Sequence, residues 1–156
     1  MRTPISDLFD SLDIAYRWLL HSEPVYTIES AGRQRGVVLD EMVKSILLRD
    51  REGRTVMACV LGGARLDTRA LQASLPPGWK RLHFASAEEI KAITGCVQGA
   101  VAPLALPEYV TVIFDEAIPR CQKVSISSGD PMAGIELLAS DLLRAARAHL
   151  AAIAQA

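Results

Sequence analysis

The most unusual position in this sequence, and one that could do chemistry, is a lysine inside an apolar segment. Lys44 lies in the segment MVKSILL (42–48), and in a β-strand it would share a face with Met42, Ile46 and Leu48, because strand side chains alternate. Desolvating an ammonium on such a face is costly, so it needs a partner or a cleft unless its stem carries the amine to water. In a cleft, this cation could stabilise negative charge on a ligand carbonyl or phosphate.

Two further segments could contact a ligand through backbone and hydroxyl groups. Residues 99–103 (GAVAP) begin with a glycine that permits close backbone approach and end with a proline that fixes the chain direction. Residues 127–130 (SSGD) offer two hydroxyls beside a flexible glycine. Each segment taken alone is more typical of an ordinary turn. A functional interpretation therefore needs the segments to converge in space.

Other kinds of catalytic centre lack their patterns in this sequence. The three cysteines and three histidines are scattered, without the close spacing of a zinc site. The sequence also lacks G-x-S-x-G, G-x-x-x-x-G-K-[ST] and G-x-G-x-x-G. We therefore expect no metal, no cofactor and no covalent serine chemistry, and we interpret the cysteines as core residues.

Periodicity and capping signals predict the elements that must position these residues. We expect one domain over residues 1–156, because no linker divides the chain. Short strands and helices interleave irregularly, which predicts an α+β fold with a curved, mostly antiparallel sheet flanked by helices. The expected helices span 6–21, 66–75 and 87–94, followed by a C-terminal helix capped by Ser140, and the expected strands span 25–28, 43–48, 55–61, 81–84, 110–114, 123–127 and 135–138.

Composition and charge narrow the setting in which the protein acts. The chain has 156 residues, of which 50% are hydrophobic and 22% charged, and no apolar run approaches the ~18 residues of a membrane span. We therefore expect a soluble, cytoplasmic protein with no membrane partner. Residues 33–81 hold ten Lys or Arg against five Asp or Glu. This excess indicates either a solvated surface or a patch that faces phosphates.

A set of motifs in a fixed order resembles a known family. The motifs are VKSILL (43–48), GARLDTRAL (63–71), IKAITG (90–95), GAVAP (99–103), VTVIFDE (110–116), SISSG (125–129) and IELLASDLL (135–143). In this order they are similar to the aminoacyl-tRNA editing domains of the YbaK and prolyl-tRNA-synthetase-associated type. The resemblance covers residues from about 21 to 145 and rests on the ordered set, since no single motif is specific.

The resemblance implies hydrolysis of the ester between a small, wrongly attached amino acid and its tRNA, by a free-standing protein that uses neither a metal nor a covalent protein nucleophile. It assigns the catalytic roles to Lys44, Gly99 and Ser127. The expected substrate-binding residues are Tyr26, Met42, Ser45, Pro103, Ser128, Gly129 and Asp130.

The resemblance also suggests the partners, which are aminoacyl-tRNA and an aminoacyl-tRNA synthetase. From the basic stretch we expect Arg33, Arg35, Arg49 and Arg54 to meet the tRNA backbone. The sequence departs from the family at Gly134, where some members carry an aspartate that Asp130 could replace. This departure keeps open a catalytically weak module that binds tRNA or a synthetase. A hydrolase of small molecules, or an enzyme that binds a carbonyl group, is a further alternative.

Overall fold

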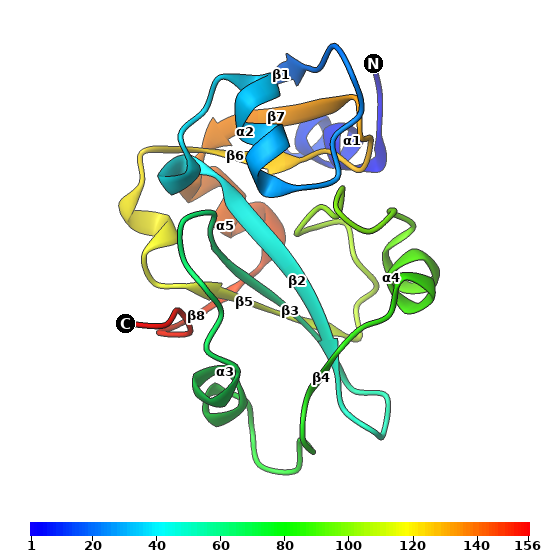
Figure 1. The fold of residues 1–156 in the computed structure, drawn as a ribbon, viewed down its shortest axis with the longest axis vertical. Helices are drawn as coiled ribbons and strands as arrows, with labels where there is room; N and C mark the ends of the chain where they lie inside the picture. The colour runs from blue at the N-terminus through cyan, green and yellow to red at the C-terminus, as the bar shows by residue number, and fades with distance from the viewer.

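Two β-sheets and five short α-helices make up the fold of this computed structural model, which describes all 156 residues (Figure 1). The three-stranded sheet has the order β1 (Tyr16–Leu20), β7 (Ala133–Leu138), β6 (Lys123–Ser127) and is antiparallel throughout. The five-stranded sheet has the order β4 (His83–Phe84), β2 (Val43–Arg49), β3 (Thr55–Leu61), β5 (Val110–Asp115), β8 (His149–Ala151). Its β3–β5 and β5–β8 pairs are parallel, and its other two pairs are antiparallel.

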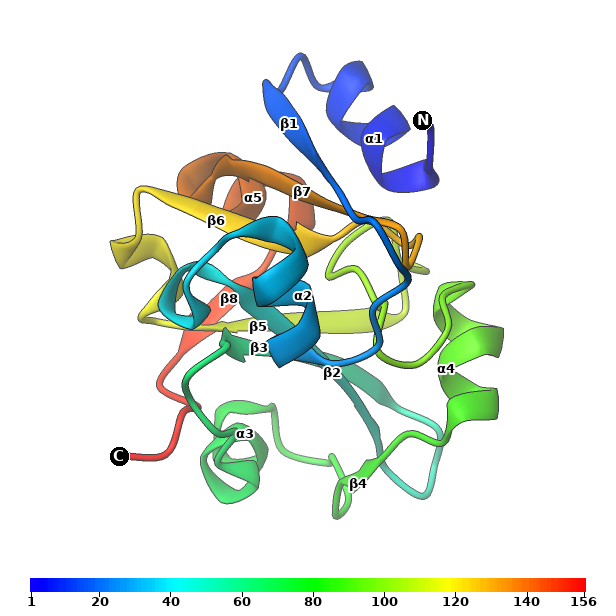
Figure 2. The same cartoon turned by 45° about the horizontal axis from the view of Figure 1, so that its top comes forward.

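The predicted α+β class and the predominance of antiparallel pairing are confirmed, but the strands form two sheets rather than one curved sheet. The sheets approach each other where Met42, just before β2, makes an isolated parallel bridge to Ser125 of β6. Between them lies the main core, which includes the fully buried Phe9, Phe114 and Ile126. Figure 2 shows the three-stranded sheet above the five-stranded one, with the ends of β2 and β6 near α2.

The helices are α1 (Pro4–Ser11), α2 (Ile28–Arg35), α3 (Thr68–Ser74), α4 (Ala87–Thr94) and α5 (Ala139–Ala146), with 3₁₀ turns at Leu39–Glu41 and Ile118–Arg120. The capping box predicted at Ser86 is confirmed: its hydroxyl accepts from the Glu89 N–H, and the Glu89 carboxylate accepts from the Ser86 N–H. No helix is long and apolar enough to cross a membrane.

Three predicted elements are wrong. The helix expected over 6–21 ends at Ser11, the chain turns at Asp13 with a φ of 55°, and residues 16–20 form β1 instead. The strand expected over 25–28 is a loop that leads into α2. Ser140 lies inside α5 rather than capping it.

The aspartate of the motif VTVIFDE, Asp115, has a structural role. Asp115 is 5% exposed, and its carboxylate accepts hydrogen bonds from the backbone N–H groups of Ile153, Ala154 and Ala117 at 2.9 to 3.1 Å. It therefore ties the C-terminal segment to the end of β5. Both of its carboxylate oxygens are already engaged by the protein, and the residue is buried, so a structural role explains it.

Candidate functional site

Five of the predicted site residues line one cavity of about 200 Å³ between α2, β2, β6 and the loop around residue 99. They are Tyr26, Lys44, Ser45, Gly99 and Ser127, and the rest of the wall comes from Thr27, Ile28, Ala31, Val43 and Val101. The segments come together only in the folded chain, because they are spread over about a hundred residues. The convergence that the sequence interpretation required is therefore present.

Lys44 has a fixed position at this cavity. It is half-buried, and its ammonium donates a hydrogen bond of 2.8 Å to the Ala64 carbonyl, in the connection between β3 and α3. An ammonium has three N–H donors, so this bond leaves two of them for a ligand. Lys44 forms no ion pair with an acidic side chain. It is a cation on a half-buried side chain, held in place by one hydrogen bond and with donors to spare.

Gly99 is required by both its backbone and its contacts. Its φ is +90°, a conformation that residues with side chains rarely adopt. A Cβ at this position would overlap the carbonyl group of Tyr26. The loop and the segment before α2 are thus in direct backbone contact, which only glycine allows. Tyr26, 56% exposed, stands at the same edge of the cavity.

Ser127 lines the cavity, whereas the three residues after it hold the turn between β6 and β7. The hydroxyl of the fully buried Ser128 donates to the Ala133 carbonyl at 2.6 Å. Asp130 accepts from the Met132 N–H at 2.8 Å, and Gly129 has a φ of 93°. These three predicted substrate-binding residues lie outside the cavity wall.

Met42 and Pro103 are also behind the wall rather than in it. Met42 is fully buried with Val25 and Ala31 beneath α2, and Pro103 is buried at the end of the loop. Both therefore support lining residues without reaching the cavity.

A thiol in contact with a lining residue is chemically inert. Cys59, directly opposite Ser45 in the β2–β3 pair, is fully buried and donates to the Ser45 hydroxyl at 3.6 Å. Burial raises the pKa of the Cys59 thiol to about 12. It therefore carries no thiolate at neutral pH, and the prediction that it is a core residue fits this environment.

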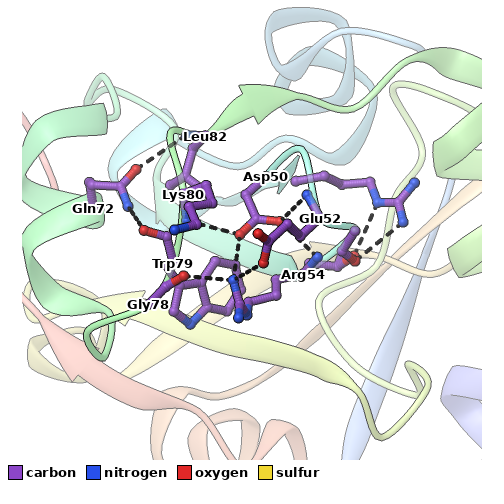
Figure 3. Close-up of polar contacts among 11 residues, drawn as sticks. Asp50, Glu52, Arg54, Gln72, Gly78, Trp79, Lys80 and Leu82 are labelled. Carbon is purple, nitrogen blue, oxygen red and sulfur yellow. Dashed lines mark hydrogen bonds and ion pairs between the residues drawn. The ribbon is translucent and has the colours of Figure 1, made fainter.

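Three of the four arginines expected to contact tRNA are instead bonded to other groups of the protein. Arg49 pairs with Glu89 at 2.7 Å. Arg54 pairs with Asp50 and Glu52 and donates to the Gly78 carbonyl at 2.6 Å (Figure 3). Arg35 faces inward, as described below. Only Arg33 is exposed and without an ion pair, as the prediction requires.

Figure 3 shows why the β2–β3 turn holds Arg54. Asp50 is 2% exposed, and its carboxylate accepts from the backbone N–H groups of Glu52, Arg54 and Lys80 at 2.9 to 3.0 Å. Burial would raise the pKa of Asp50, but these bonds and the Arg54 guanidinium outweigh it and lower the pKa. The cluster joins the hairpin to the segment after α3 and is structural.

A buried histidine and arginine lie behind α2. His21 is 7% exposed, and its Nδ1 lies 2.7 Å from the Pro131 carbonyl, which can only accept. Nδ1 therefore carries the proton, and Nε2 accepts from Arg35 Nε at 3.1 Å. Burial is the main cause that lowers the pKa of His21, and the Arg35 charge adds to it, against the Pro131 carbonyl and Asp130, which raise it.

This histidine predicts a pH dependence of stability. As the pH falls through the ordinary histidine pKa of about 6.5, His21 is protonated in the unfolded chain at a higher pH than in the folded one. The free energy of unfolding should therefore fall as the pH drops from 7 to 5. Urea unfolding at a series of pH values measures this slope. His21→Asn should flatten it, and His83→Asn, at an exposed position on β4, should not; equal slopes in all three proteins would contradict the assignment.

The sequence interpretation missed α2 and therefore three lining residues, Thr27, Ile28 and Ala31. Local signals for this helix were present. Thr27 caps it by accepting from the Ser30 N–H at 3.1 Å, and Gly36 ends it in the left-handed conformation. The polar sequence IESAGRQR and its internal glycine hid the pattern.

Comparison with known proteins identifies the family. A family model described as "Aminoacyl-tRNA editing domain" matches residues 22–145, which include every residue that lines the cavity. The chain belongs to the aminoacyl-tRNA editing domain family. The resemblance inferred from the ordered motifs is therefore confirmed.

Relatives of this editing domain include a protein of similar length and a much longer one. The Prolyl-tRNA editing protein ProX of Acetoanaerobium sticklandii is 30% identical over 145 residues, which cover 90% of this chain and 87% of ProX. The proline–tRNA ligase of Trichlorobacter lovleyi is 31% identical over 99 residues, covering 64% of this chain but 17% of the ligase. In length, the editing domain therefore matches ProX and is a small part of the ligase.

Solved structures share the fold of the editing domain. The hypothetical protein APE2540 has a TM-score of 0.86 at 24% identity, with 98% of this chain and 100% of that chain covered. A candidate trans-editing enzyme for prolyl tRNA synthetase has a TM-score of 0.77 at 21% identity, covering 100% of this chain and 99% of that one.

Proposed function

We propose that this editing domain is an aminoacyl-tRNA deacylase that hydrolyses mischarged aminoacyl-tRNA in trans. The observation that carries the site assignment is the convergence of Lys44, Gly99 and Ser127 on one cavity of about 200 Å³. When an ester carbonyl becomes an oxyanion, its negative charge can be stabilised by a cation held in place, by backbone N–H groups and by a hydroxyl.

In the proposed reaction, water attacks the ester carbonyl carbon and the carbonyl oxygen becomes negatively charged. The ammonium of Lys44 and N–H groups of the loop at Gly99 stabilise this charge, and the Ser127 hydroxyl orients the aminoacyl group. The bond from the carbonyl carbon to the ribose oxygen then breaks, and that oxygen takes the proton released by the water. The neighbouring ribose hydroxyl relays this proton, since Cys59 is buried with a raised pKa and His21 is engaged by Arg35.

The cavity can hold the amino acids expected from the resemblance. A volume of about 200 Å³ has room for the side chain of Ala, Cys, Ser or Thr, the small amino acids that we propose as substrates. We propose proline tRNA as the carrier, because the relatives are named for prolyl-tRNA editing and proline–tRNA ligase. The match to most of ProX supports action in trans in the cytoplasm, with prolyl-tRNA synthetase as a transient partner.

A deacylation screen tests this function. Proline tRNA charged with Ala, Cys, Ser, Thr or Pro is incubated with the protein, and loss of the aminoacyl ester is followed over time. We expect turnover of at least one small mischarged amino acid and none of prolyl-tRNA. Tight binding of these tRNAs without any turnover would instead favour the catalytically weak binding module. Hydrolysis of an aminoacyl ester without tRNA, unaffected by salt, would favour the small-molecule hydrolase.

The proposed tRNA contacts come from exposed arginines other than Arg35, Arg49 and Arg54, which the protein itself engages. Arg33 is one of them. Arg69 and Arg81 flank a groove of about 670 Å³ between α3 and β4, beside the 63% exposed Phe84, and no acidic residue lines this groove. Arginines with an exposed aromatic ring form the usual surface for an RNA backbone and an unpaired base.

We expect the double variant Arg69→Glu/Arg81→Glu to lose affinity for tRNA and to depend less on salt. Each lost phosphate contact should reduce the slope of log K against log salt by about 1. The measurement is kcat/KM on mischarged tRNA and on the matching aminoacyl-adenosine, which has no phosphate to contact. Arg120→Glu, a reversal at another exposed arginine, is the control. An equal loss on both substrates would exclude this groove as the tRNA surface.

A further inference from the structure

The side chain of Arg35 lies against the face of the three-stranded sheet behind the cavity. Its Nε donates to His21 at 3.1 Å and one terminal nitrogen donates to the Ser125 hydroxyl at 3.0 Å. No carboxylate pairs with it, and burial alone lowers its pKa to about 10. Arg35 is thus a half-buried cation held only by neutral groups.

Gly134 makes room for this guanidinium. A Cβ at residue 134 would overlap Nε and Cζ of Arg35. In this chain the side chain of Arg35 therefore occupies the space that a side chain at residue 134 would need. The Asp130 carboxylate holds the β6–β7 turn by accepting from the Met132 N–H.

The strand register places the guanidinium next to the cavity. Gly134 is directly opposite Ser127 in the β6–β7 pair, so both face the same side of the sheet. Ser125, which accepts from Arg35, lies two residues before Ser127 and shares this face. Ala31, one helical turn before Arg35 on α2, also lines the cavity. The residues that Arg35 contacts therefore neighbour two lining residues, Ser127 and Ala31, although Arg35 itself is not part of the cavity wall.

We propose that Arg35 closes the rear of the cavity and thereby limits the size of the aminoacyl group that the editing domain accepts. This inference rests on the proposed function. An apolar side chain of equal volume would fill the space at a lower desolvation cost. The guanidinium instead holds a fixed position through its bonds to two elements, which makes the rear wall rigid. A rigid wall excludes larger groups by steric clash, whereas differences in binding affinity alone discriminate poorly between groups of similar size.

The test compares esters of different size on the same tRNA. We expect Arg35→Ala to open the space beside Gly134 and to raise kcat/KM for leucyl-tRNA relative to alanyl-tRNA by about 10-fold or more. Arg35→Met, which keeps the volume but not the charge, should keep nearly the wild-type ratio. Arg33→Ala, on the exposed side of the same helix, is the matched control, because weaker tRNA binding lowers both rates equally.

A binding measurement makes the result independent of turnover. Non-hydrolysable 3′-aminoacylamino-adenosines carrying alanyl or leucyl groups are titrated into each protein, and Arg35→Ala should gain affinity for the leucyl compound. Arg35→Ser offers the same opening with a hydroxyl if the alanine variant does not fold. An unchanged ratio in a folded variant overturns the proposal, as does an equal shift in Arg35→Met. If the wild type binds these compounds but hydrolyses no mischarged tRNA, the proposed function fails while the size limit stands.

Discussion

Replacing Lys44 by methionine should lower kcat for hydrolysis of small aminoacyl-tRNAs by about 10² to 10³, without unfolding the protein. Methionine keeps most of the unbranched stem but removes the ammonium, so the variant loses the hydrogen bond to the Ala64 carbonyl and the charge at the cavity. Loss of one preorganised donor to a developing oxyanion costs about 3 kcal/mol. Because this charge develops in the transition state, kcat should fall more than KM rises.

Single-turnover deacylation and urea unfolding together check this expectation. Lys91→Met provides the matched control, since Lys91 also donates to a backbone carbonyl, that of Gly95 at 3.1 Å, but lies on α4 outside the cavity wall. Its activity should match that of the wild type. A folded Lys44→Met protein with full activity would remove this lysine from the mechanism.

The sequence predicted the residues whose position depends on local pattern. Lys44 and Ser45 could be placed because the β2–β3 hairpin has strong alternation and an obvious turn. The capping box of α4 was equally readable. Gly99 and Ser127 came from the order of motifs across the chain, which the family match over residues 22–145 now supports.

The elements near the N-terminus were mispredicted because distant partners decide them. Residues 16–20 continue the helical spacing of α1, yet they form β1 because each pairs with a residue of β7, about 120 positions later. A tertiary pairing of this kind overrides local periodicity. The segment before α2 has strand-forming residues, but Thr27 caps a helix there.

The partners of the arginines could not be predicted, because charge excess does not reveal where each side chain points. Arg49 and Arg54 meet acidic residues that fold next to them. Arg35 turns inward because residue 134, ninety-nine positions later, has no side chain. The sequence showed this departure from the family pattern only as a missing aspartate at Gly134. In the structure, the side chain of Arg35 fills the space at that position.

Substitution of Gly99 by alanine should abolish most deacylation, since two independent penalties meet at this residue. Its φ of +90° costs a residue with a side chain about 1 to 3 kcal/mol. In addition, the new Cβ would overlap the Tyr26 carbonyl, so the loop or the start of α2 must move. A displacement of about 1 Å at a reacting centre can cost 10²-fold in rate, and we expect at least that loss in kcat/KM.

The variant Gly95→Ala separates the two penalties, because Gly95 has a φ of 75° but open space around it. This variant should be destabilised yet remain active. If both variants retain the same activity, backbone contact at Gly99 does not shape the site.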